Sequence, residues 1–178
     1  MQSITDSQGT ELKGQTCCNG SSVLDFTGIC KDGASALVSK LGELLANLQV
    51  CYTNVRGFHW TITGHSFFTL HSKFEDQYND LAEKIDEVAE RILTLGGIPE
   101  NNFSKYLQVS SIKEVTGVCC GKAAVTNILE SYKVIIAIEK EIMELANSAK
   151  DEATLSLISD YLKAQEKTVW MFVAYLKG

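Results

Sequence analysis

The sequence predicts an all-α fold: a bundle of four long helices with a short extra helix in the connection between the second and the third. Four stretches repeat apolar residues at steps of three and four, the period of a helix with one buried face. Pro99 is the only proline in 178 residues, and proline breaks helix interiors. Because 45% of the residues are apolar and 21% are charged, the composition is that of one globular domain.

Residues 1–31 are polar, rich in Gly, Ser, Thr and Asn, and have no sustained apolar period. We therefore expect a flexible arm ahead of a bundle domain that spans residues 32–178. The first residues lack the basic and apolar regions of a secretory signal, and no apolar run approaches the roughly 18 residues of a membrane span. These observations favour a cytoplasmic protein without a membrane-spanning segment.

The first two long helices are bounded by residues that start and stop helices. The first is expected to begin at Asp32, a capping residue type, and to end near Thr61, before Gly64. The second is expected to begin at Ser66 and to stop at Gly96-Gly97, shortly before Pro99. Together they bring residues 59 and 71 to the two sides of one turn.

A long crossover follows, and it is expected to contain one short helix at Ser111–Glu114. The third long helix then covers roughly 121–148, and the fourth runs from about Asp151 to Lys177. Within the third helix, several acidic residues are interpreted as a solvated face. These residues are Glu139, Glu141 and Glu144.

Metal-ligating residue types gather on the second helix. His71 and Glu75 are four residues apart and share one helix face, and Asp86 and Glu90 repeat this spacing further along. At about 100° per residue, all four fall on one stripe of the helix. Imidazole and carboxylate ligands suit Fe(II), and they would also accept zinc or manganese. The sequence has neither a Glu-x-x-His nor a His-Glu-x-x-His motif, which argues against a di-iron centre inside one bundle.

The rise of a helix decides how these residues can meet. Glu75 and Asp86 are about 16 Å apart along the helix axis, too far for one metal site. If all five residues share a site, a second copy must lie antiparallel and contribute its Asp86 and Glu90, while His59 joins His71 across the turn. The alternative is that Asp86 and Glu90 belong to a solvated helix face.

Residues 58–97 resemble the signature region of the Dps mini-ferritins, which belong to the ferritin-like superfamily. The resemblance rests on His-Trp at the end of the first helix, G-x-x-F-F-x-L-H at the start of the second, and D-E-x-A-E-R-I-x-x-L-G-G at its close. Their separations match without a gap. The similarity covers roughly residues 33–177 and is weaker after 118.

The resemblance implies a twelve-subunit shell around an iron-storage cavity. It implies a ferroxidase that binds two iron ions at each site on a two-fold dimer interface, usually with hydrogen peroxide as the preferred oxidant, and that protects against oxidative damage. By position, His59, His71 and Glu75 would come from one subunit, and Asp86 and Glu90 from its partner. Glu75 stands where many members have aspartate. The ligand type is the same, and the longer reach of its carboxylate is expected to change the affinity or the binding of the second iron ion.

Further residues take expected roles by analogy. Trp60 resembles a tryptophan of the family that lies near the centre and intercepts stray oxidants, and packing explains it equally well. Asp151 and Glu152 are expected at a three-fold pore for iron entry, although acidic residues also favour the first turn of a helix. Trp170 is interpreted as core packing, and His65 as a residue of a surface turn.

The charge of the chain disfavours DNA as a partner, although DNA binding is known in the family. The net charge is −6, and residues 1–31 carry two lysines against three acidic residues, with no basic tail at the other end. Phosphate binding needs clustered positive charge. We expect weak or absent DNA binding, and the alternative function is a nucleoid-associated protein that compacts DNA.

Six cysteines are unusual for a cytosolic chain of this size, and none forms a C-x-x-C motif. One interpretation is that they are buried or idle thiols. The others are bridges between subunits, or binding of a soft metal or haem, for which the pair near the start of the third helix is better placed. The residues are Cys17, Cys18, Cys30, Cys51, Cys119 and Cys120.

Overall fold

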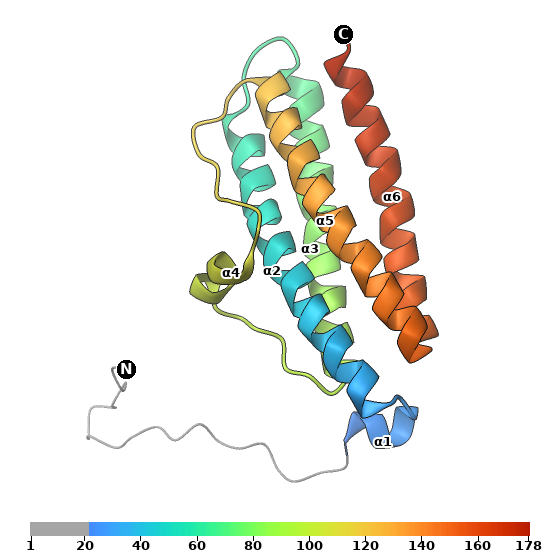
Figure 1. Ribbon diagram of the computed structural model, residues 1–178. Coiled ribbons are helices and arrows are strands. Elements are labelled where there is room, and N and C mark those ends of the chain that lie inside the picture. Colours follow the sequence, from blue (N-terminus) through green and yellow to red (C-terminus); the bar gives the residue numbers. More distant parts are fainter. Residues whose placement is uncertain (1–21) are drawn as a thin grey trace, which may run out of the picture.

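The computed structural model describes residues 22–178, and the regular structure in this part of the chain is helical throughout. Four long helices lie side by side as a bundle, and a short helix lies outside it against α2 (Figure 1). The predicted helical bundle is confirmed. In chain order the helices are α1 (Val23–Thr27), α2 (Lys31–Thr61), α3 (Phe67–Thr94), α4 (Phe103–Val109), α5 (Gly121–Ala149) and α6 (Glu152–Leu176).

The core runs along the inside of the four long helices. α2 packs against α3, α4 and α5, so its apolar residues are buried over most of its length. α6 packs chiefly against α5. None of the described helices combines the length and apolar character that crossing a membrane requires. Side chains at the centre of the core include Leu37, Leu41, Leu44, Phe74, Leu81, Ile128 and Ile135.

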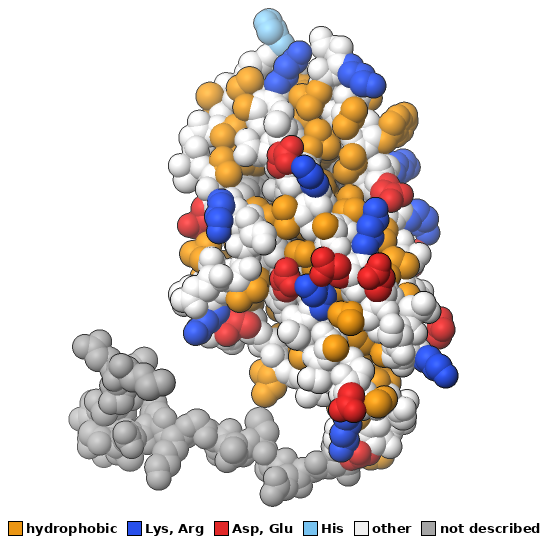
Figure 2. Space-filling view, in the orientation of Figure 1, with side chains coloured by type: hydrophobic (Ala, Val, Ile, Leu, Met, Phe, Trp, Pro, Cys, Tyr) orange, Lys and Arg blue, Asp and Glu red, His pale blue; other side chains and the backbone are white. Residues whose placement is uncertain are grey.

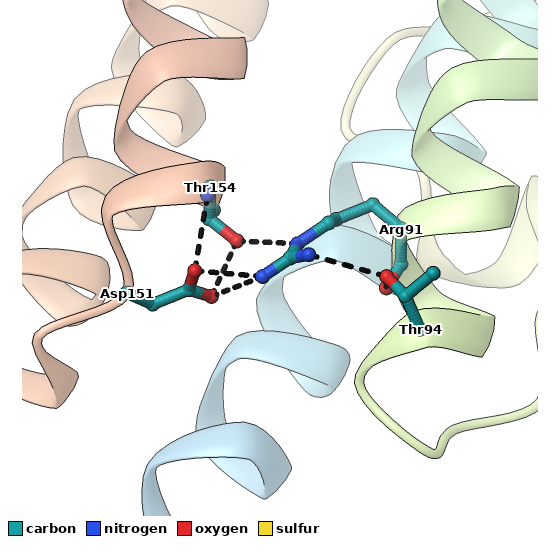
Figure 3. A network of polar contacts seen from close by, with 4 residues as sticks. All are labelled: Arg91, Thr94, Asp151 and Thr154. Atoms are coloured by element: carbon teal, nitrogen blue, oxygen red, sulfur yellow. Dashed lines mark hydrogen bonds and ion pairs between the residues drawn. The ribbon is translucent and has the colours of Figure 1, made fainter. Parts of the chain in front are cut away.

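A buried ion pair ties the end of α3 to the start of α6 (Figure 3). The Arg91 guanidinium donates to both carboxylate oxygens of Asp151 at 2.7 Å and to the Thr154 hydroxyl at 2.8 Å. Asp151 also caps α6 by accepting the Thr154 N–H at 3.1 Å. Lys150, with φ of 56°, ends α5 in the left-handed conformation and turns the chain into this cap.

The short helix of the crossover was predicted in the wrong place. It lies at Phe103–Val109, and residues 111–120, which include the predicted helix at Ser111–Glu114, are not helical. Two buried asparagines of α2 explain why this segment is not helical. Asn47 Oδ1 accepts the backbone N–H groups of Ser111 and Ile112, and the Asn54 side chain binds the backbone of residues 113 and 115. These bonds satisfy the backbone groups that a helix would have used.

Two further predictions differ from the structure. Part of the expected arm is helical: in α1, Ser22 and Asp25 form a capping box, while residues 1–21 lie outside the described part of the chain. Glu139 was expected on a solvated face, and it is fully buried, whereas Glu141 and Glu144 are exposed. Glu139 is buried because it stands among the core positions of α5, beside Ile138 and one turn after Ile135.

Candidate functional site

Two histidines meet across the α2–α3 turn and hold each other in place. His59 lies in the last turn of α2 and His71 in the second turn of α3, and their rings stack with centroids 3.8 Å apart at 22°. The Nδ1 of His59 lies 2.8 Å from the carbonyl oxygen of His71, and the Nδ1 of His71 lies 2.9 Å from the carbonyl oxygen of His59. A carbonyl only accepts, so both Nδ1 atoms carry a hydrogen, and both Nε2 lone pairs remain free for a metal ion.

The turn that brings the two histidines together is anchored to the start of α5. The backbone N–H of Thr63 donates to the Cys119 carbonyl at 3.1 Å, and the Thr61 hydroxyl donates to the Val118 carbonyl at 2.6 Å. Gly64 takes a φ of +96°, a conformation that favours glycine, so the chain can reverse before α3 begins. The histidine pair therefore rests on α2, α3 and the segment that leads into α5.

Aromatic rings enclose the pair on two sides. The Phe67 ring stacks on His71 with centroids 5.0 Å apart, and the rings of Tyr78 and His59 meet in a T-shaped arrangement with centroids 5.3 Å apart. His59 is buried and His71 is half-buried. The rings restrict both imidazoles to one orientation, as expected for preorganised ligands.

Glu75 lies one turn beyond His71 and is exposed. Burial and the neighbouring Glu75 carboxylate raise the pKa of Tyr78, so this phenol stays neutral beside the site. Sequence reasoning missed Tyr78, although its position, seven residues after His71 and three after Glu75, places it on the same side of α3.

Asp86 and Glu90 are exposed on α3, one turn apart, and do not join the histidine pair of their own chain. About 11 residues of helix rise, roughly 16 Å, separate Asp86 from Glu75. Among the described residues no group of three or more His, Cys, Asp or Glu side chains is arranged to hold one metal ion. One chain thus gathers His59 and His71 with Glu75 nearby. The other two predicted ligands, Asp86 and Glu90, lie elsewhere on α3.

Trp60, next to His59, is 66% exposed. The Arg56 guanidinium lies 5.1 Å from the Trp60 ring centroid and 4.9 Å from that of Tyr52, and it donates to the Tyr52 hydroxyl at 3.1 Å. The side chain of Trp60 therefore lies on the surface beside the histidine pair rather than in the core of its own chain.

The other residues singled out in the sequence lie away from the pair. His65 is exposed in the turn, and Trp170 is 67% exposed, so its interpretation as core packing is wrong for the single chain. Both oxygens of Asp151 are engaged by Arg91 and the residue is buried, so a pore role would fall to Glu152, which is exposed.

The described cysteines divide into two groups. Cys51 is buried in the core, and burial raises the pKa of its thiol to about 12, as expected for an idle thiol. Cys30, Cys119 and Cys120 are exposed, and backbone N–H groups at the start of α5 lower the pKa of Cys120. Cys17 and Cys18 lie outside the described residues.

Comparisons with known proteins agree on one family. Residues 38–178 match the model of the ferritin-like domain. The chain is 48% identical to a DNA protection during starvation protein of Porphyromonas gingivalis, over 86% of the chain and 96% of that protein. It is 37% identical to DNA protection during starvation protein 2 of Bacillus anthracis, over 79% and 96%.

Solved structures give the same result. The crystal structure of a Dps protein from Vibrio cholerae superposes with a TM-score of 0.85 at 42% identity, covering 89% of this chain and 99% of that one. That protein is described as a member of a broad superfamily of ferritin-like diiron-carboxylate proteins. A Dps protein from Bacillus brevis superposes with a TM-score of 0.78 at 34% identity, covering 82% and 97%.

Proposed function

Because the chain belongs to the Dps family of ferritin-like proteins, we propose that it oxidises Fe(II) with hydrogen peroxide at sites shared between two subunits. The Fe(III) is stored in a hollow shell of twelve subunits, which protects against oxidative damage. The observation that carries the proposal is the histidine pair, whose two Nε2 atoms are held ready for a metal ion. Among the described residues of one chain, no group of three or more ligand side chains is arranged to complete the ligand set.

The missing ligands are supplied by a second copy. Two chains related by a two-fold axis with antiparallel α3 helices bring Asp86 of the partner subunit and Glu90 of the partner subunit to the His71 end of this one. The same operation forms an equivalent second site, as two-fold symmetry requires. The roughly 16 Å between the two halves of the stripe on α3 supports this arrangement, because one straight helix cannot bring its two ends to one ion.

The surface beside the site also supports a partner. Exposed apolar side chains lie in two adjoining hollows along α2, with Trp60 in one and Phe103 and Leu107 of α4 in the other. Beside Trp60, the Arg56 Nε is buried without a hydrogen-bond partner in the described part of the chain. Exposed aromatic and aliphatic side chains beside an unsatisfied buried donor are typical of an interface.

The ligand types fit the chemistry of iron oxidation. Neutral imidazole nitrogens bind Fe(II), and carboxylate oxygens stabilise the higher charge of Fe(III). Two Fe(II) ions give one electron each to hydrogen peroxide, which with two protons becomes two molecules of water. The pairing avoids the hydroxyl radical that one Fe(II) ion alone would release. We assign to Trp60 the interception of oxidants that escape, and to the exposed Glu152 a place at an iron-entry pore.

DNA compaction is the weaker candidate. The relatives' names refer to DNA protection, which peroxide removal can provide without contact with DNA. The chain has a net charge of −6. On the face seen in Figure 2, lysine and arginine side chains are scattered among acidic ones rather than gathered in a patch. Clustered positive charge is what phosphate binding requires.

The proposal is tested by measuring peroxide consumed and Fe(II) oxidised by the assembled protein. We expect one peroxide for every two Fe(II) ions, and strongly slower oxidation in His59→Ala and Asp86→Ala variants. His65→Ala is the matched control, since this histidine is exposed in the turn and outside the proposed ligand set. Equal rates in the His59→Ala variant and the control would refute the assigned site.

A further inference from the structure

A glutamate and a glutamine face each other inside the bundle, where α5 meets α6. Glu139 is 0% exposed and Gln165 is 1% exposed. The Gln165 Nε2 donates to Glu139 Oε1 at 2.7 Å. The remaining oxygens of the same two side chains, Glu139 Oε2 and Gln165 Oε1, are also buried and have no hydrogen-bond partner among the described residues. Both are acceptors, so neither can satisfy the other when the carboxyl is ionised.

One proton would satisfy both oxygens. A protonated Oε2 of Glu139 can donate to Gln165 Oε1 while Glu139 Oε1 accepts from Gln165 Nε2. The two side chains then form a closed pair with two hydrogen bonds, as a carboxylic acid and an amide do. Buried polar atoms are nearly always hydrogen-bonded, so the two orphaned oxygens themselves point to this proton.

The charged groups near Glu139 and Gln165 also favour a protonated Glu139. From α3, the Lys84 ammonium is 7% exposed and already forms an ion pair with Asp80, and it lies 5.2 Å from the centroid of the Tyr161 ring of α6. Lys84 is therefore one cation beside two carboxyl groups, those of Asp80 and Glu139, and it is already paired with Asp80. An ionised Glu139 would add a negative charge that Lys84 does not balance, and buried unbalanced charge is strongly unfavourable.

The other buried titratable groups around the pair are neutral. Burial raises the pKa values of Tyr132 on α5 and Cys51 on α2, so neither ionises near neutral pH. The Tyr161 hydroxyl donates to Glu87, which also keeps this phenol protonated. Burial raises the pKa of Glu139 itself to about 8, against the opposing effects of Gln165 and Lys84.

We infer that Glu139 is protonated in the folded protein and forms with Gln165 a two-bond latch that joins α5 to α6 and opens in alkaline solution. Loss of the proton removes one of the two hydrogen bonds and leaves the carboxylate charge in the core. α6 packs chiefly against α5, so its attachment weakens when the latch opens. The folded state holds the proton more tightly than the unfolded chain, so stability falls as pH rises from the ordinary carboxyl pKa through the raised one.

The test compares the full-length wild type with Glu139→Gln. The new amide donates where the protonated acid donates and cannot ionise, so the variant mimics the closed latch at every pH. We expect similar melting temperatures near pH 5, and at pH 9 a midpoint roughly 5 °C or more above that of the wild type. Glu141→Gln, an exposed glutamate two residues away, is the control and should keep the pH dependence of the wild type.

Infrared spectroscopy of the same proteins gives an independent measurement. At pH 6 the wild type should show the C=O band of a buried protonated carboxyl group, which disappears above pH 9 and is absent from the Glu139→Gln variant. A wild type without this band would overturn the inference. A variant that is less stable than the wild type at pH 5, or that keeps the same pH dependence, would overturn it as well.

Discussion

Replacing Asn47 with alanine should release the crossover from α2 and destabilise the subunit. The Asn47 side chain is fully buried, and its Oδ1 accepts the N–H of Ser111 at 3.0 Å and that of Ile112 at 3.1 Å. Alanine leaves both donors without this acceptor. At about 1–3 kcal/mol for each unsatisfied group, the loss of free energy of unfolding should be about 2–6 kcal/mol. The crossover carries α4, so the change should also weaken the proposed dimer surface.

The assay is chemical denaturation of the full-length protein together with hydrogen exchange at the amides of Ser111 and Ile112. Both amides should be protected in the wild type and should exchange much faster in the variant. Asn127→Ala is the matched control, because the Asn127 amide donates only to the carbonyl of Ala123 in its own helix. A loss of stability no larger than in this control, or unchanged exchange at both amides, would refute the role of Asn47.

Three further outcomes are expected. Arg91→Ala should cost about 3 kcal/mol or more of unfolding free energy, because it leaves the Asp151 carboxylate buried and unpaired, whereas Lys163→Ala, which breaks an exposed pair, should have little effect. Burial would raise the pKa of Asp151, but hydrogen bonds from Thr154 and Arg91 outweigh it and lower this pKa; stability should therefore fall as pH drops through that pKa, and an Asp151→Asn variant should lose this acid dependence in thermal melts. A gel-shift titration at moderate salt should show no tight DNA complex, and tight binding would contradict the charge argument.

The long helices were predictable because their signals are local. A repeat of 3.6 residues and stops such as Gly96-Gly97 are read from neighbouring positions, and the predicted ends lie within a few residues of the observed ones. The position of α4 was not predictable in this way. Asn47 and Asn54 bind backbone groups about 60 residues away in sequence, and no local pattern reports such bonds.

The candidate site was likewise predictable only where its signals are local. Spacing alone predicted that His59 and His71 would meet across one turn, and that Asp86 and Glu90 would lie too far away to join them. The reciprocal bonds between each Nδ1 and the other histidine's carbonyl depend on the geometry of the turn, and they became visible only in the structure. The prediction that Glu139 lies on a solvated face was wrong because it rested on the charge of the residue and not on its position in the helical repeat.

The most direct measurement of the central claim, a site shared between subunits, is complementation in mixed particles. One subunit type carries His59→Ala and His71→Ala, the other carries Asp86→Ala and Glu90→Ala, and each alone should oxidise Fe(II) at the background rate. When the two subunit types are co-assembled in equal amounts, about half of the dimers are mixed. Each mixed dimer regains one of its two sites, so about a quarter of the wild-type rate should return. Mixed particles that stay at the background rate would contradict the shared site.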